Sequence, residues 1–434
     1  MRDAVIILLV AAGSLVAIKR PWIGIMLWTW LSIMSPHRFA WGAAYDAPLA
    51  AIAAASTLTG LLFTRDRSSP FKGGAAVMLV LFMVWMTASW LMGLDPRGDY
   101  EQWNKVMKID LMILVALALL HTKQHIFALA WVATGSLALL GAKGGVFTLL
   151  NAGGQRVWGP AGSFIEDNNA FALAVVMTIP LLRFLQLQLT HFWARQGMTV
   201  VMLLCAGSAL GSYSRGGFIA IAAMALVLWW RGKSRLVGGI FLAVVALALV
   251  AFMPEIWMAR MESIREYEQD SSAMGRISAW WVAWGIALHY PTGVGFDMAR
   301  PELFALYSPF PGEARAAHSN YFQILANHGF IGLALYVSIF VATWRSAGWL
   351  RTQTGAFPQA KWCADLGAMC QVSLVGYGVG GVFLGLAYFD LPYNVMVMVL
   401  VTCVWVRTRG WEREPVYPSG WRSIPGLSYV TKSG

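Results

Sequence analysis

The chain has 434 residues, of which 58% are hydrophobic and 12% are charged, and its mean hydropathy is +0.60. Soluble domains have about 45 to 50% apolar and about 25% charged residues, so this composition excludes a soluble enzyme with one anchor. The net charge of +11 does not indicate a nucleic-acid partner, because excess basic charge in a polytopic protein usually lies in cytoplasmic loops. The four cysteines lie in or beside apolar runs without metal-ligand spacing, which favours small core residues.

The sequence predicts an all-α, polytopic membrane helical bundle. Its first apolar run lacks a small-x-small cleavage site, so we interpret it as a retained span and not as a signal peptide. The first two runs and the last two could each be a hairpin that does not fully cross, so we expect about twelve spans of roughly 20 residues. The candidate spans are residues 4–18, 22–34, 47–63, 75–93, 107–120, 125–149, 169–187, 198–212, 216–230, 236–252, 320–344, 366–388 and 391–406.

The distribution of Lys and Arg predicts the orientation, because basic side chains in short loops resist translocation. The basic loops contain Arg65, Arg67, Lys72, Arg231, Lys233, Arg235, Arg345, Arg351 and Lys361, and the basic tail contains Arg407, Arg409 and Arg413. We place this side in the cytoplasm. Alternation then exports residues 35–46, 94–106, 150–168, 212–216 and 253–319, which form the outer face.

The segment 253–319 is too long for a plain connector, and long ordered loops usually carry function. We therefore divide the chain into membrane helices (1–252), a large periplasmic loop domain with short helices (253–319), further membrane helices (320–406) and a cytoplasmic tail (407–434). Within the loop, Trp280, Trp281 and Trp284 put at least two indoles on one helical face. They indicate either an amphipathic helix at the lipid headgroups or an aromatic stripe packed inside the loop domain.

Two arginines occupy positions where a charged guanidinium is either costly to place or well suited to bind an anion. Arg215 begins an apolar run, where an ionisable group usually faces a cavity or a partner; the alternative is an arginine that snorkels to the outer headgroups. The neighbouring Ser214, Gly216 and Gly217 favour a close approach of backbone to an anion. Arg276 follows residues that can cap a helix, an arrangement that suits phosphate oxygens; the alternative is a salt bridge to a carboxylate of the same loop.

His318 lies where the long loop returns to the membrane, and its side chain can exchange a proton near neutral pH. The alternative is an interfacial histidine hydrogen-bonded to a loop carbonyl. Asn320 could orient His318 or an acceptor hydroxyl, and His328 is typical of a structural residue.

The outer segment before residue 169 carries further polar candidates. Arg156, Glu166, Asp167, Asn168 and Asn169 could bind sugar hydroxyls or supply a carboxylate base, or they could cap a helix start. We add Arg265 of the long loop to the predicted substrate-binding residues. No metal-ligand cluster, Walker sequence, G-x-S-x-G or complete dinucleotide fingerprint occurs, so we expect no metal and no cofactor.

Three separated segments share one pattern: SRGG at Arg215, GRISAWWVAWGIALHYPTGVGF at Arg276 and HSNYFQILANHGFIGLALY at His318. In order, spacing and outer placement they resemble the bacterial O-antigen ligase and polymerase superfamily. The first 190 or so residues resemble O-glycosylation ligases associated with exosortase loci.

This resemblance implies transfer of a glycan from undecaprenyl pyrophosphate to the lipid A core at the periplasmic face, without metal or nucleotide. It implies functional roles for Arg215, Arg276 and His318. Two guanidinium groups could stabilise the charge on the leaving pyrophosphate, and His318 could take the acceptor proton, with Asp167 or Glu166 as the alternative base. A direct displacement would invert the anomeric centre, and the polyprenyl tail would lie among membrane lipids.

Other functions stay open at this point. An O-antigen polymerase or a protein O-glycosylation ligase would use the same donor. A transporter would show ionisable residues near mid-bilayer and inverted repeats, and neither is visible. An inert scaffold would tolerate replacement of all three site residues.

Overall fold

The computed structural model describes residues 2–232, 235–262, 271–310, 312–355 and 357–413. These residues form helices and connecting loops with no β-strand among them, in agreement with the predicted all-α class. The first half contains α1 (Arg2–Lys19), α2 (Pro21–Met34), η1 (Pro36–Phe39), α3 (Ala43–Asp46), α4 (Leu49–Phe63), α5 (Gly74–Leu91), α6 (Tyr100–Leu119), α7 (Lys123–Leu150) and α8 (Asn168–Gln188).

The second half follows with α9 (Phe192–Gly211), α10 (Arg215–Arg231), α11 (Arg235–Phe252), α12 (Glu255–Glu262), α13 (Ser271–His289), α14 (Pro301–Tyr307), α15 (Asn320–Thr354), η2 (Pro358–Ala360), α16 (Lys361–Gly380), α17 (Asp390–Arg407) and α18 (Gly410–Arg413). Helices α12, α13 and α14 lie in the segment for which we predicted short helices. Its periplasmic location stays a prediction.

Five helices in the described part of the chain are long and apolar enough to cross a membrane, and they identify a multi-pass membrane protein. They are α5, α7, α8, α15 and α17, and they match the predicted spans 75–93, 125–149, 169–187, 320–344 and 391–406. Helices α2, α4 and the described part of α11 are apolar but shorter. The total of about twelve spans therefore stays a prediction.

Helices α8 and α17 form the centre of the bundle, since most of their residues are buried on every side. Helix α8 packs against α9 and α16, and α15 packs against α5 and α16. Glycines permit some of these close approaches: a Cβ added at Gly211 would lie 2.1 Å from the Thr148 hydroxyl oxygen, and one at Gly380 would lie 2.5 Å from Leu173. A Cβ added at Gly207, one turn before Gly211, would meet no atom of the described residues within 4 Å.

The predicted span 366–388 is wrong at its end. Helix α16 ends at Gly380, and residues 381–389 form a loop before α17, which we call the 381–389 loop. Turn hydrogen bonds begin it, with the Phe383 N–H donating to the Gly380 carbonyl at 2.9 Å. Hydropathy could not reveal this break, because Leu384 and Leu386 are buried in the bundle although they are not helical.

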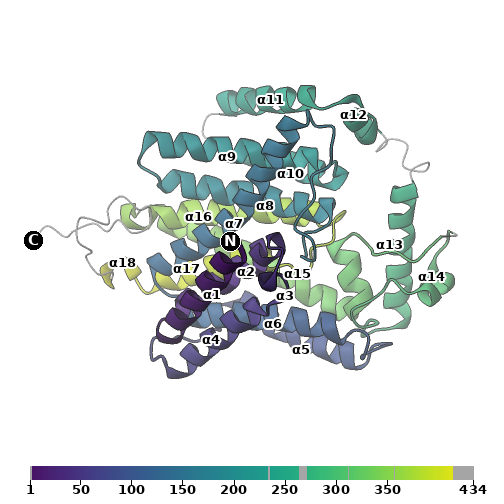
Figure 1. Cartoon of the computed structure of the whole chain (residues 1–434), viewed down its shortest axis with the longest axis horizontal. Coiled ribbons are helices and arrows are strands. Elements are labelled where there is room, and N and C mark those ends of the chain that lie inside the picture. Colours follow the sequence, from purple (N-terminus) through teal and green to yellow (C-terminus); the bar gives the residue numbers. More distant parts are fainter. Residues whose placement is uncertain (1, 233–234, 263–270, 311, 356, 414–434) are drawn as a thin grey trace, which may run out of the picture.

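Helix α13 runs roughly across the ends of the long helices (Figure 1). Trp281 and Trp284 on this helix are 55% and 45% exposed, whereas Trp280 packs inward with its ring stacked on Phe322 at a centroid distance of 5.0 Å. One indole of the tryptophan group therefore belongs to the packed interior and two face outward, and the position of this helix at the lipid headgroups stays a prediction.

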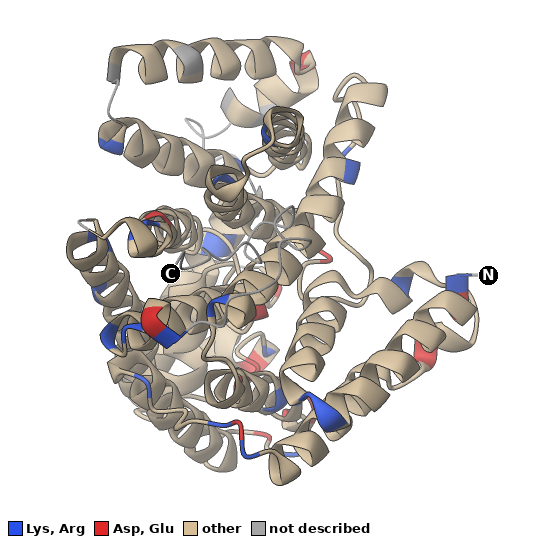
Figure 2. Cartoon of the chain, turned by 90° about the vertical axis from the view of Figure 1, so that its left-hand side faces the viewer, with Lys and Arg blue, Asp and Glu red and all other residues tan. Residues whose placement is uncertain are grey.

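The opposite end of the bundle carries α18 and the connection between α4 and α5. Figure 2 faces this end and shows Lys and Arg spread around it. The pattern is the one expected for a cytoplasmic side, and the orientation stays a prediction.

Candidate functional site

His318 lies directly before α15, and its backbone φ of +44° is in a region that residues other than glycine rarely adopt. Such backbone strain often occurs at functional sites. Ser319 follows it and caps α15 by accepting a hydrogen bond from the Phe322 N–H. Burial lowers the pKa of His318, the Arg276 guanidinium lowers it further, and the Asp167 carboxylate raises it. The net effect is a lowered pKa, so the imidazole is neutral at neutral pH and can accept a proton.

Arg276 lies in the second turn of α13 and is half-buried. Its Nη1 donates a hydrogen bond of 3.2 Å to the carbonyl oxygen of Phe383 in the 381–389 loop. The loop carboxylates at 266, 268 and 270 lie outside the described residues, so the alternative of a salt bridge to one of them stays untested. Asp270, which we expected to help cap this helix, lies there too.

Arg215 is the first residue of α10, whose start is fixed by a capping hydrogen bond. The Ser214 hydroxyl accepts from the Gly217 N–H at 3.1 Å and donates to Asn169 Oδ1 at 2.9 Å. A Cβ added at Gly216 would lie 2.8 Å from Leu384, and one at Gly217 would lie 2.8 Å from Ala172. These glycines thus serve helix packing, and our expectation that they favour the approach of an anion has no support here.

The segments that carry the three predicted functional residues meet at three consecutive residues of the 381–389 loop. Phe383 accepts the hydrogen bond from Arg276, and Leu384 packs against Gly216 beside Arg215. A Cβ added at Gly385 would lie 3.9 Å from the His318 Cα. Segments separated by up to 170 residues in sequence therefore meet at one place.

Asn320 holds this loop in position. Its backbone N–H donates to the Gly381 carbonyl at 2.7 Å, and its side-chain oxygen accepts from the Leu386 N–H. The Ser319 hydroxyl donates to the same Gly381 carbonyl at 3.3 Å. This arrangement gives Asn320 a positioning role, and its predicted contact with substrate stays untested.

The polar residues before α8 act mainly as caps and braces. Asp167 Oδ1 accepts from the backbone N–H groups of Asn169 and Ala170, at 2.9 and 3.3 Å. The Asn168 amide donates to the Ser212 carbonyl at 2.6 Å, which joins α8 to the turn before Arg215. The capped helix start that we considered is present, and it leaves the Asp167 carboxylate close enough to His318 to influence its charge.

The remaining predicted residues lie at the margin of the site or outside the described part. Glu166 accepts from the Gly162 N–H at 2.8 Å within its own loop. The exposed Arg156 lies 5.7 Å from the ring centroid of Tyr213, two residues before Arg215. Arg265 lies outside the described residues.

An apolar cavity of about 340 Å³ begins at Ile277, directly after Arg276 on α13. It is lined by Ile277, Trp280, Trp281, Trp284 and Phe322. The Trp280 ring also lies 6.2 Å from the Phe383 ring, so this apolar surface continues to the loop that binds Arg276.

Residues from the first half of the chain hold the backbone around the kink in α15. Gly329 interrupts this helix with a φ of +67°, and a Cβ there would lie 2.1 Å from the Pro291 carbonyl oxygen. Trp85 Nε1 donates to the His328 carbonyl at 2.7 Å, and the Ser89 hydroxyl donates to the Asn327 carbonyl at 2.8 Å. These bonds satisfy carbonyls that the broken helix leaves without partners, as a membrane interior requires.

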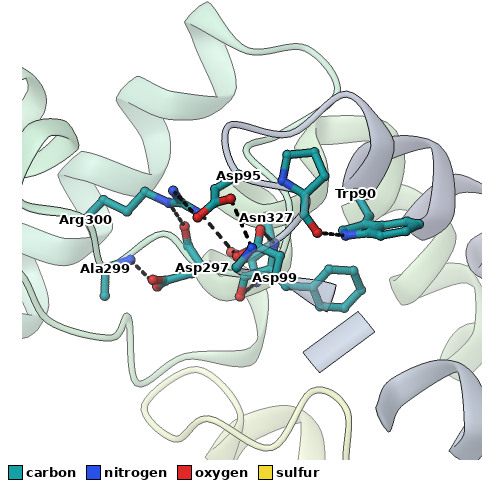
Figure 3. A network of polar contacts seen from close by, with 10 residues as sticks. Trp90, Asp95, Asp99, Asp297, Ala299, Arg300 and Asn327 are labelled. Carbon is teal, nitrogen blue, oxygen red and sulfur yellow. Dashed lines mark hydrogen bonds and ion pairs between the residues drawn. The ribbon is translucent and has the colours of Figure 1, made fainter. Parts of the chain in front are cut away.

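A second brace joins the segment before α6 to the long loop (Figure 3). Asp99 accepts a hydrogen bond of 2.7 Å from the Phe296 N–H and forms an ion pair of 3.1 Å with Arg300. The other terminal guanidinium nitrogen of Arg300 lies 4.0 Å from Asp95. The Asn327 amide donates to the Phe296 carbonyl at 3.2 Å. We call these contacts the Asp99 brace.

Sequence reasoning missed both the 381–389 loop and the Asp99 brace. The cluster of Gly376, Gly378, Gly380 and Gly381 could have signalled the end of α16. Nothing in the sequence could have paired Asp99 with residues almost 200 positions away.

The structure thus brings Arg276, His318 and the start of α10 together at the 381–389 loop. Residues 200–337 match the family described as O-antigen ligase, and this range contains Arg215, Arg276 and His318. The match supports membership of the O-antigen ligase superfamily. Residues 1–190 match a family of unknown function (DUF5935). No curated protein matches the chain.

Proposed function

We propose that this protein is an O-antigen ligase that transfers a glycan from undecaprenyl pyrophosphate to the lipid A core at the periplasmic face of the inner membrane. The observation that carries this proposal is the convergence of Arg276, His318 and the Arg215 helix start on residues 383–385. The superfamily membership of residues 200–337 supports a reaction of the O-antigen ligase or polymerase type. The resemblance of residues 1–190 to exosortase-associated ligases stays a prediction.

The residues fit a direct displacement. The acceptor hydroxyl attacks the anomeric carbon, its proton passes to the neutral His318, and the bond from that carbon to the pyrophosphate oxygen breaks. Arg276 and Arg215 would stabilise the charge on the departing undecaprenyl pyrophosphate. One displacement without a covalent enzyme intermediate inverts the anomeric configuration. The apolar cavity beside Arg276 could receive the first isoprene units of the tail.

The nearest alternative is an O-antigen polymerase or a protein O-glycosylation ligase, because either reaction uses the same donor and the same charge stabilisation. We would reconstitute the purified protein in nanodiscs with a lipid-linked glycan and lipid A core, and follow the product on gels. Transfer to the lipid A core by this protein alone would support the ligase. Chain growth on the lipid-linked glycan, with no product on the core, would support the polymerase.

A further inference from the structure

The first half of the chain carries three cations that lie over aromatic rings on the side that we predict to be periplasmic. Arg38 lies in η1, Lys105 in the second turn of α6, and Lys143 in α7. Each cation lies over an aromatic ring, which holds it in place. The distances to the ring centroids are 4.8 Å from Arg38 to Tyr45, 3.8 Å from Lys105 to Phe164 and 5.0 Å from Lys143 to Phe39.

Arg38 and Lys105 lie beside the loop that leads to the candidate site, and Lys143 lies over the ring of Phe39, the residue next to Arg38. A Cβ added at Gly162 would lie 3.1 Å from the guanidinium carbon of Arg38, and Lys105 lies over Phe164 two residues later. Arg38 also contributes to the electrostatic field at Lys105, which places the two groups near each other. Phe164 precedes Asp167 by three residues, so these two positions are at most about 11 Å apart.

No carboxylate neutralises this group by a direct ion pair. Within the residues that the structure describes, none of the three cations has a carboxylate oxygen within 4.0 Å. Asp390 contributes to the field at Lys105 and one of its oxygens accepts from the Ser32 hydroxyl, but Asp390 makes no ion pair with Lys105 among the described residues. Like charges repel at close range, so an unpaired group of cations is a site for an anion.

The position of Lys143 along α7 also supports a site for an anion. It lies seven residues before the end of α7, which is about 10 Å along the helix axis. It is therefore inside the predicted span 125–149, where an ionisable residue usually has a functional partner.

We propose that Arg38, Lys105 and Lys143 form an anion site that binds a phosphate or carboxylate group of the acceptor saccharide and so presents its hydroxyl to His318. This inference rests on the proposed function for the identity of the acceptor. It assigns a binding role to the half of the chain whose family has no known function. Charge-assisted hydrogen bonds to anionic oxygens would supply the affinity.

The test measures equilibrium binding of purified lipid A core, intact or treated with phosphatase, to the protein in phosphatidylcholine nanodiscs. We would compare the wild type with an R38Q/K105Q/K143Q variant. The control is Lys108→Gln, which removes one positive charge from an exposed position on the same helix as Lys105 and is matched to the single variant Lys105→Gln. We expect the triple variant to bind intact core at least about tenfold more weakly and the control to bind normally. Phosphatase treatment should weaken binding to the wild type and have little further effect on the triple variant.

Equal affinity of the wild type and the triple variant for intact core would overturn the proposal. Nanodiscs with added phosphatidylglycerol provide the second arm. If the substitutions change activity only in these nanodiscs and leave core binding unchanged, the site binds lipid phosphate and the proposal is wrong. Size-exclusion profiles check folding, and the three single variants replace the triple variant if it aggregates.

The binding assay also separates this inference from the proposed function. If the wild type binds intact core through the three cations but transfers no glycan, the anion site is supported and the proposed reaction is rejected. If the wild type transfers glycan normally and the triple variant binds core as the wild type does, the reaction is supported and the anion site is rejected.

Discussion

Residues 200–337 and residues 1–190 contribute to the candidate site in different ways. The first region contains the three residues that we predict to act in the reaction, Arg215, Arg276 and His318. The second supplies side chains that hold backbone groups of the first: Trp85 and Ser89 at the kink of α15, and Asp99 at Phe296. The family match therefore does not mark a self-sufficient unit, because bonds from the other half fix the segment that precedes and follows His318.

The largest expected effect is on the reacting side chains. His318→Ala should lower the transfer rate by roughly 10² to 10⁴, the usual contribution of a general base, and leave donor binding intact. Donor binding and single-turnover rates in nanodiscs would measure both quantities. His191→Ala, at an exposed position before α9, is the control. Transfer at the normal rate would show that His318 is not the base.

Substitution of Arg215 or Arg276 should have the second-largest effect on transfer. Arg276→Lys and Arg215→Lys keep the charge but lose the planar donor fork that binds two phosphate oxygens. We expect transfer to fall on the order of a hundredfold, as a loss of several kcal/mol requires, with an unchanged elution volume. Arg195→Lys on α9 is the matched control, and full activity in either site variant would contradict the assigned role.

The Asp99 brace tests whether the first half is needed for the second. Asp99→Ala leaves the Phe296 N–H without a partner, and a buried unsatisfied group costs about 1 to 3 kcal/mol. We expect a lower Tm and faster proteolysis of the 294–300 segment. Asp95→Asn should have almost no effect, because its half-exposed carboxylate lies 4.0 Å from Arg300 and exposed ion pairs contribute little. Similar results for the two variants would argue against the brace.

A smaller effect on the pH profile follows from the Asp167 carboxylate. Asp167→Asn keeps a residue that caps helices well but removes a charge that raises the pKa of His318. The pKa should fall further, so the acidic limb of kcat/KM should move to lower pH while the rate at neutral pH changes little. Loss of transfer at every pH would instead identify Asp167 as the base.

The smallest expected effect is that of metal removal. If the two arginines stabilise the leaving charge as we propose, protein treated with a strong chelator should keep its transfer rate. Activity that collapses and returns on addition of magnesium would show that a metal takes part.

The fold class and several helices followed directly from the sequence. The apolar runs predicted α5, α7, α8, α15 and α17 with ends correct to within a few residues at most of their boundaries. They succeeded because a span of about 20 apolar residues is a local property. The end of α16 was missed, since Leu384 and Leu386 are as apolar as a helix interior.

The candidate site shows the same division. The sequence alone singled out Arg215 and His318, because each places an ionisable group at a predicted membrane boundary. It singled out Arg276 because this residue follows others that can cap a helix. Only the tertiary structure decided that the 381–389 loop brings their segments together and that the first half of the chain braces them. The physical reason is that hydropathy and capping act between near neighbours in sequence, whereas these contacts form between backbone groups that only the packed bundle brings within hydrogen-bonding distance.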